Sequence, residues 1–116
     1  MNLAVTVGLI QRDVQDLRAK LRFSRESLAR ALDVSTRTVE RWEGGAVTEN
    51  PAVFRRLDEL SEIVELGQAV YGEAFPRFLV TPRRSLAGRS PAAALLRGDV
   101  ADVRDLLAQT HEGQWG

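Results

Sequence analysis

The sequence lacks cysteine and contains one histidine among its 116 residues. The absence of cysteine excludes disulfides, thiolate zinc sites and a cysteine nucleophile, and a lone His111 excludes a histidine cluster that could hold a metal ion. Paired catalytic carboxylates, a nucleophile–base arrangement and a phosphate-binding loop are also missing. We therefore expect a protein that is not an enzyme and that has no metal or cofactor of its own.

Long apolar runs are absent too. No stretch approaches the roughly 20 residues that a membrane-spanning helix needs, and the opening MNLAVTVGLIQRD lacks the basic leader and long apolar core of a secretion signal. We expect a cytoplasmic protein with no membrane contact. Alternating β-branched residues are almost missing, which favours an all-α fold. A hydrophobic content of 44% suits one compact unit or two small helical ones.

The formal net charge is zero, but it is unevenly divided. Residues 1–56 contain ten basic and seven acidic residues, whereas residues 57–116 contain six basic and nine acidic ones. Imbalances of this size also arise by chance, so the basic first half supports DNA binding only weakly.

Two short helix patterns meet at a tight turn between Ser24 and Gly45. Ser24 is suited to cap the first helix, and Asp33 is suited to end it, because Asp tolerates the left-handed conformation. Val34 is expected to fill the corner, and Ser35 to cap the second helix. The apolar faces that this spacing predicts consist of Leu28, Ala29 and Leu32 in the first helix and Val39 and Trp42 in the second.

The second helix has a polar outward face with Arg37, Glu40 and Arg41, flanked by Thr36 and Thr38. Such a face is suited to the major groove of DNA. The layout resembles the helix-turn-helix of the Xre/Cro repressor family, in which the second helix reads DNA and the first braces it across the backbone. The family's core positions match Leu28, Ala29, Leu32, Val34, Val39 and Trp42, and the WEGG segment resembles the helix-ending segment that follows. One departure is Asp33, where the family usually has Gly at the turn.

This resemblance implies a set of DNA contacts. Arg37 is the first choice for bidentate contact with guanine, and Thr36 would lie near thymine methyls or base edges. The phosphate contacts would come from Ser24, Arg25, Ser35, Thr38 and Arg41. Because the charge is small, useful occupancy calls for a dimer that spans two half-sites of an operator. Arg37 and Arg41 could also be ordinary solvated charges.

Helical patterns surround this motif. Ile10, Val14, Leu17 and Leu21 form one apolar stripe, and Asn50 with Pro51 begins a long helix that runs to Gly72. Proline and glycine make the next helices short. A last helix follows Asp99, and a mobile tail, residues 111–116, ends the chain. We expect an N-terminal Xre/Cro-like helix-turn-helix bundle (residues 1–56), joined by a long helix to a small C-terminal helical domain (residues 57–116).

The stretch from Phe75 to Gly113 resembles the C-terminal domain of Xre/MbcA/ParS-type antitoxins. Phe78, Leu79, Thr81 and Pro82 match that domain's aromatic-Leu-x-Thr-Pro segment. The other matching positions follow in order: Leu86, Gly88, Pro91, Leu95, Leu96, Val103, Leu106, Leu107 and Gly113. The family often has Asn after the Thr-Pro pair, where this chain has Arg83 and Arg84.

The resemblance implies an antitoxin that neutralises a toxin with a RES domain, an enzyme family that consumes or uses NAD. The C-terminal domain of such antitoxins covers the entrance of the toxin's active site. The indole of Trp115 could fill a pocket there, or it could fold back onto the last helix, and a terminal carboxylate can pair with an arginine. The candidate toxin-binding residues are Arg83, Arg84, His111, Glu112, Gln114, Trp115 and Gly116; Arg83 and Arg84 could also simply decorate a loop.

Three functions remain open. The first is an antitoxin that blocks a RES-type toxin and represses its own operon, as a homodimer within a larger toxin–antitoxin hetero-oligomer. The second is a stand-alone Xre-family repressor whose second half only dimerises, and the third is an interaction protein whose helix-turn-helix no longer binds DNA. We expect the dimer interface on the long helix and the segment after it, where Val70, Tyr71, Phe75 and Phe78 offer apolar surface.

Overall fold

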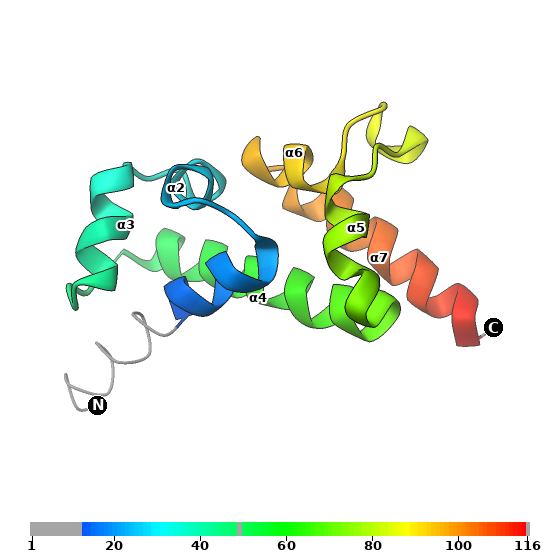
Figure 1. Ribbon diagram of the computed structural model, residues 1–116, viewed down its shortest axis with the longest axis horizontal. Coiled ribbons are helices and arrows are strands. Elements are labelled where there is room, and N and C mark those ends of the chain that lie inside the picture. The colour runs from blue at the N-terminus through cyan, green and yellow to red at the C-terminus, as the bar shows by residue number, and fades with distance from the viewer. Residues whose placement is uncertain (1–12, 49, 116) are drawn as a thin grey trace.

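The computed structural model describes residues 13–48 and 50–115, with side chains described as far as His111. These residues form helices and turns and contain no strand, which confirms the all-α prediction. The elements, shown in Figure 1, are a helix over residues 13–21, α2 (Arg25–Leu32), α3 (Thr36–Glu43), α4 (Pro51–Tyr71), the 3-10 turn η1 (Gly72–Ala74), α5 (Phe75–Val80), the 3-10 turn η2 (Arg84–Leu86), α6 (Pro91–Leu96) and α7 (Val100–Trp115).

Four helices begin at side-chain caps, because an oxygen that precedes a helix satisfies one of its unpaired N–H groups. The hydroxyls of Ser24, Ser35 and Ser90 accept hydrogen bonds from the backbone N–H three residues later. The amide oxygen of Asn50 accepts from the backbone N–H of Ala52 at 3.0 Å. The predicted starts of α2, α3 and α4 are therefore confirmed.

The long helix α4 runs through the centre of the molecule (Figure 1). It begins with Pro51 in its first turn and ends at Gly72, whose positive φ of 55° suits glycine. Helix α4 packs along α7 and also contacts α2 and α5. The predicted spine between the two halves is thus a single continuous helix.

The buried apolar side chains form one cluster that extends from the helix of residues 13–21 to α7. Phe75 and Phe78 belong to it, with 1% and 2% of their surfaces exposed. Gly67 explains how Phe75 fits, because a Cβ at this position of α4 would overlap the ring of Phe75. The expectation that Phe75 and Phe78 form free interface surface is therefore wrong, since the chain buries both rings itself.

Helix α7 differs from the prediction at its C-terminal end. The sequence predicted a tail from His111 onward, but the backbone is helical through Trp115. A glycine such as Gly113 costs a helix about 1 kcal/mol but does not forbid it. Ile10 and Gly116 lie outside the described residues. Within the described ranges, no helix combines the length and apolar character that crossing a membrane requires.

Candidate functional site

The turn between α2 and α3 is closed by Asp33 in the left-handed conformation, with φ 58° and ψ 47°. The N–H of Asp33 donates to the carbonyl of Arg30 at 3.2 Å, and the N–H of Val34 donates to the carbonyl of Ala29 at 2.9 Å. This pair of bonds is the Schellman motif, which glycine usually closes. Arg56 of α4 supports the turn, because its Nη1 donates to the carbonyl of Leu32 at 3.2 Å and its Nη2 lies 3.7 Å from the Asp33 carboxylate.

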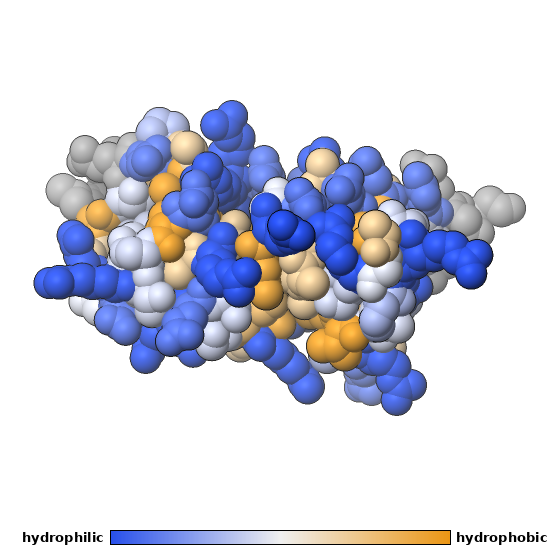
Figure 2. Space-filling view, turned by 90° about the horizontal axis from the view of Figure 1, so that it is seen from above, coloured by the Kyte–Doolittle hydropathy of each residue, from blue (hydrophilic) through white to orange (hydrophobic). Residues whose placement is uncertain are grey.

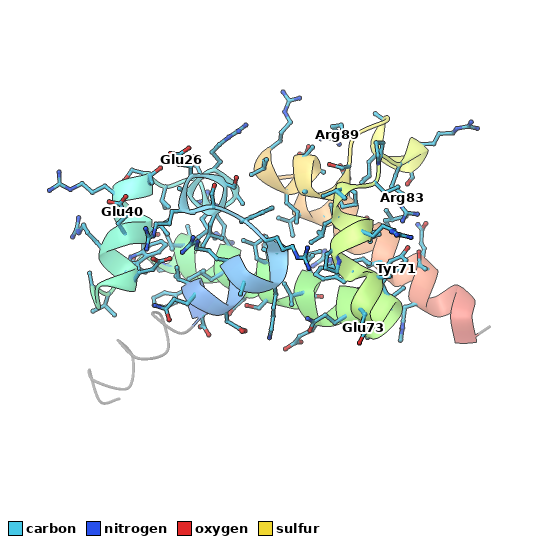
Figure 3. The ribbon with its side chains drawn as sticks, viewed as in Figure 1. Glu26, Glu40, Tyr71, Glu73, Arg83 and Arg89 are labelled. Atoms are coloured by element: carbon cyan, nitrogen blue, oxygen red, sulfur yellow. The ribbon has the colours of Figure 1, made fainter. Side chains whose placement is uncertain are left out.

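Helix α3 has the two faces that the sequence predicted. Val39 and Trp42 are buried, whereas Arg37, Glu40 and Arg41 are exposed. Arg37 and Arg41 form no ion pair within the described part of the chain, so both guanidinium groups are available to a partner. Figure 3 shows Glu40 on the outer side of α3, away from α4.

The hydroxyls at the start of α3 already have partners. Ser35 Oγ accepts from the N–H of Thr38 at 3.1 Å and lies 2.8 Å from Thr38 Oγ1. Ser24 Oγ is engaged in the same way at the start of α2, where it accepts from the N–H of Ser27 at 3.0 Å. Ser24 Oγ also donates to Ser27 Oγ at 3.1 Å. These hydroxyls stabilise the helix ends, and each can bind a phosphate oxygen only by turning its proton toward it.

Glu43 at the end of α3 joins three helices. Its Oε1 accepts from Arg18 Nη1 in the helix of residues 13–21, and its Oε2 accepts from Arg25 Nε in α2, each at 2.7 Å. Burial of the side chain, which is 9% exposed, raises the pKa of Glu43, but the hydrogen bonds and charges of Arg25 and Arg18 outweigh that effect and hold it below its ordinary value of 4.5. Arg25, a predicted phosphate contact, is therefore held in place by an ion pair.

Sequence reasoning did not identify Glu43 or Arg18 as part of this arrangement. Arg18 and Arg25 lie 25 and 18 residues before Glu43, so neither pair follows a local helical spacing. A hollow of about 380 Å³ opens beside the two arginines, between the starts of α2 and α3. Its walls are Arg18, Ser24, Arg25, Glu26, Thr36 and Glu40. The structure thus brings Ser24, Arg25 and Thr36 together, but it also places the carboxylates of Glu26 and Glu40 there.

Arg83 lies on an aromatic platform in the second half. The ring centroids of Tyr71 and Phe78 are 4.6 Å apart, and the guanidinium carbon of Arg83 lies 5.0 Å from the Phe78 centroid and 5.8 Å from that of Tyr71. Figure 3 shows Arg83 above Tyr71. Arg83 Nε is buried with no hydrogen-bond partner among the described residues, so the rings supply its principal contact.

The loop after α5 is fixed by its own backbone and by Arg89. The N–H of Arg83 donates to the carbonyl of Arg89 at 3.0 Å, and Arg89 Nη1 donates to the Asp99 carboxylate at 2.6 Å. Arg84 is exposed at the start of η2. Among the predicted toxin-binding residues, Arg83 therefore has a packing role, whereas Arg84 faces solvent.

His111 lies on the last turns of α7, where it lines a shallow hollow with Glu62, Glu65, Leu66 and Ala69 of α4. Glu112, Gln114 and Trp115 belong to α7 by their backbone, and their side chains lie outside the described part, as does Gly116. In Figure 1 the loop that carries Arg83 and Arg84 and the C-terminal end of α7 lie toward the same end of the molecule, opposite α3.

No protein-family model matches the sequence, and no curated protein matches it. A solved structure does match: the fold is similar to a chain of the M. tuberculosis MbcT–MbcA toxin–antitoxin complex, with 25% sequence identity and a TM-score of 0.67. The chain resembles MbcA-type antitoxins. The similarity covers 90% of this chain and 96% of that chain. The likeness to MbcA-type antitoxins therefore extends over both halves, including the α2–α3 pair and the helices from α5 to α7.

Proposed function

We propose that this protein is the antitoxin of a toxin–antitoxin pair. Its C-terminal part (residues 57–116) binds a RES-domain toxin that consumes NAD and blocks the toxin's active site, and its N-terminal part (residues 1–56) binds operator DNA and represses the operon. The observation that carries this proposal is the similarity of nearly the whole chain to a chain of a known toxin–antitoxin complex. For a stand-alone repressor, we would expect similarity to such a chain only in the DNA-binding half.

The geometry of α3 supports the DNA-binding part of the proposal. Arg37 and Arg41 are exposed on the outer face of a helix whose inner face is buried through Val39 and Trp42. We assign base contact to Arg37 and Thr36, and phosphate contact to Ser24, Arg25, Ser35, Thr38 and Arg41. An operon repressor of this kind would act as a homodimer, because two half-sites double the contacts that one short helix makes.

The end of the chain supports the toxin-binding part. Helix α7 carries His111, Glu112, Gln114 and Trp115 on its last turns, and Gly116 follows. An indole and a carboxylate on a projecting helix end suit a pocket that contains an arginine. We assign the block of the active site to these residues, with Arg84 as an additional contact from the loop.

Co-expression with the protein encoded by the neighbouring gene, which the proposal expects to be a RES-domain toxin, tests the proposal. Wild-type antitoxin is expected to restore growth and to co-purify with the toxin. Deletion of residues 112–116 is expected to release toxicity while operator binding in a gel shift persists. Arg37→Ala is the matched control, since it is expected to weaken operator binding and leave neutralisation intact. If the wild-type protein binds the operator normally but does not neutralise the toxin, the protein is a stand-alone repressor instead.

A further inference from the structure

A groove separates the first half of the molecule from α5 and α6. One wall contains Leu21, Arg22 and Phe23, which connect the helix of residues 13–21 to α2. The opposite wall contains Arg77 and Val80 of α5 and Leu96 of α6. Its volume is about 540 Å³.

The groove has an apolar floor that opens to solvent. Val80 at the end of α5 is 70% exposed, although it is a large hydrophobic side chain. Beside it lie the edges of Leu21, Phe23 and Leu96. Figure 2 looks onto this side of the molecule and shows hydrophobic residues in the middle, with hydrophilic residues around them. An apolar strip with a polar rim is typical of a surface that binds another protein.

The two charged side chains that line the groove, Arg22 and Arg77, are both positive. Residues 75–98 contain five arginines and no acidic residue, whereas residues 57–74 contain five acidic residues and no basic one. Arg89 is engaged by Asp99 and Asp102. Arg22 and Arg77 are exposed on the rim and form no ion pair within the described residues. The groove therefore offers apolar contact between two uncompensated positive charges.

We propose that this groove is a second docking site for the toxin, distinct from the C-terminal end of α7, and that it takes an amphipathic segment whose apolar side chains are flanked by carboxylates. The inference rests on the proposed function, because it names the toxin as the occupant. Charge complementarity selects the segment: Arg22 and Arg77 would pair with its carboxylates, and its apolar residues would cover Val80.

Other occupants fit the groove less well. DNA would match the arginines but not the apolar floor, since phosphates gain nothing from Val80 or Leu96. The first 12 residues of this chain carry one charged side chain, Arg12, which has the same sign as the rim.

Ser27 of α2 also lines the groove, so a toxin segment bound there would lie against the helix that precedes the DNA-reading helix.

Photo-crosslinking of the complete complex tests the proposal. p-Benzoylphenylalanine replaces Val80 in the full chain, which is co-purified with the RES-domain toxin that the proposed function assigns to it. We expect a crosslink to a toxin peptide that contains both acidic and apolar residues. The same group in place of Arg55, an exposed α4 residue outside the groove, is the control and is expected to give no crosslink to that peptide. A Val80 crosslink to this chain, to a second copy or to operator DNA overturns the proposal.

Affinity measurements complete the test. Arg77→Glu and Val80→Asp are expected to weaken the toxin complex at least tenfold, and Arg55→Glu to change it less than twofold. Arg77 and Val80 are exposed, so unchanged thermal unfolding checks that both variants fold. Unaltered affinity in both groove variants, with an intact wild-type complex, rejects the groove and leaves the proposed function standing. No complex with the wild-type chain rejects the proposed function and this inference with it.

Discussion

Arg25 Nε donates to Glu43 Oε2 at 2.7 Å, and this contact joins the first residue of α2 to the last residue of α3. Arg18 donates to the other carboxylate oxygen at the same distance. Two arginines thus share one largely buried carboxylate, which links the helix of residues 13–21, α2 and α3. The arrangement has consequences for stability and for its dependence on pH.

We expect Glu43→Gln to lower the free energy of unfolding by about 1 to 3 kcal/mol at neutral pH, because hydrogen bonds to a charged group contribute this much. The pKa of Glu43 is lowered in the folded protein. Its stabilisation is therefore fully present above the ordinary value of 4.5 and is lost as the pH falls through the lower folded pKa. Urea unfolding of both proteins from neutral pH down to about pH 3 measures the difference. A difference that stays constant across this range would contradict the assignment.

Gly67→Ala is expected to destabilise the protein by about 1 to 3 kcal/mol, although alanine is the better helix former. The reason is the overlap between the added Cβ and the ring of Phe75. Thermal and urea unfolding measure the loss. Phe75→Leu in the same chain should recover part of it, so the two changes together should cost less than the sum of each alone. If the losses of unfolding free energy from the two substitutions simply add, residue 67 does not depend on a close approach to the ring of Phe75.

Arg37→Ala is expected to cost about 1 to 3 kcal/mol of operator binding and to relax specificity at one base position, because its guanidinium is assigned to a base edge. Arg41→Ala should weaken operator and random DNA by similar factors, because a phosphate contact reads no sequence. Gel shifts at several salt concentrations separate the two effects. Equal losses on both kinds of DNA for both variants would reject the division of roles.

Arg83→Met is expected to lower the free energy of unfolding by about 0.5 to 2 kcal/mol, the range of a cation–π contact. Methionine keeps an unbranched, flexible side chain, although a shorter one, and removes the charge above Tyr71 and Phe78. The exposed neighbour provides the control, and Arg84→Met should stay within about 0.5 kcal/mol of wild type. Chemical unfolding of the three proteins measures this. Equal stability of all three would mean that the aromatic platform gains nothing from the cation.

The local parts of the fold could be predicted from the sequence. The caps Ser24, Ser35 and Asn50 accept hydrogen bonds from N–H groups two or three residues away. Their effect therefore depends on neighbouring residues in the sequence alone. The two faces of α3 follow from helical spacing in the same way. The left-handed Asp33 was also predictable, since few residue types tolerate that conformation.

The contacts between distant residues were not predictable. Sequence reasoning did not single out Glu43, because its partners come from two other helices. It did not single out Gly67 either, because the reason for this glycine is the ring of Phe75, which α5 brings against α4. Phe75 and Phe78 were assigned to an interface because the sequence does not show that α5 packs against α4. Apolar residues in a short sequence do not reveal whether the chain itself covers them.

Because α4 is one continuous helix, its length fixes both the distance and the rotation between the two ends of the molecule. A helix of 21 residues is a rod, and at 1.5 Å per residue it spans about 31 Å. One residue inserted in its middle would turn everything after it by about 100° around the helix axis. Under the proposed function, a toxin bound at the C-terminal end would then point in another direction relative to operator DNA bound at α3. Natural changes in the length of this rod should therefore come in whole turns, about seven or eleven residues at a time.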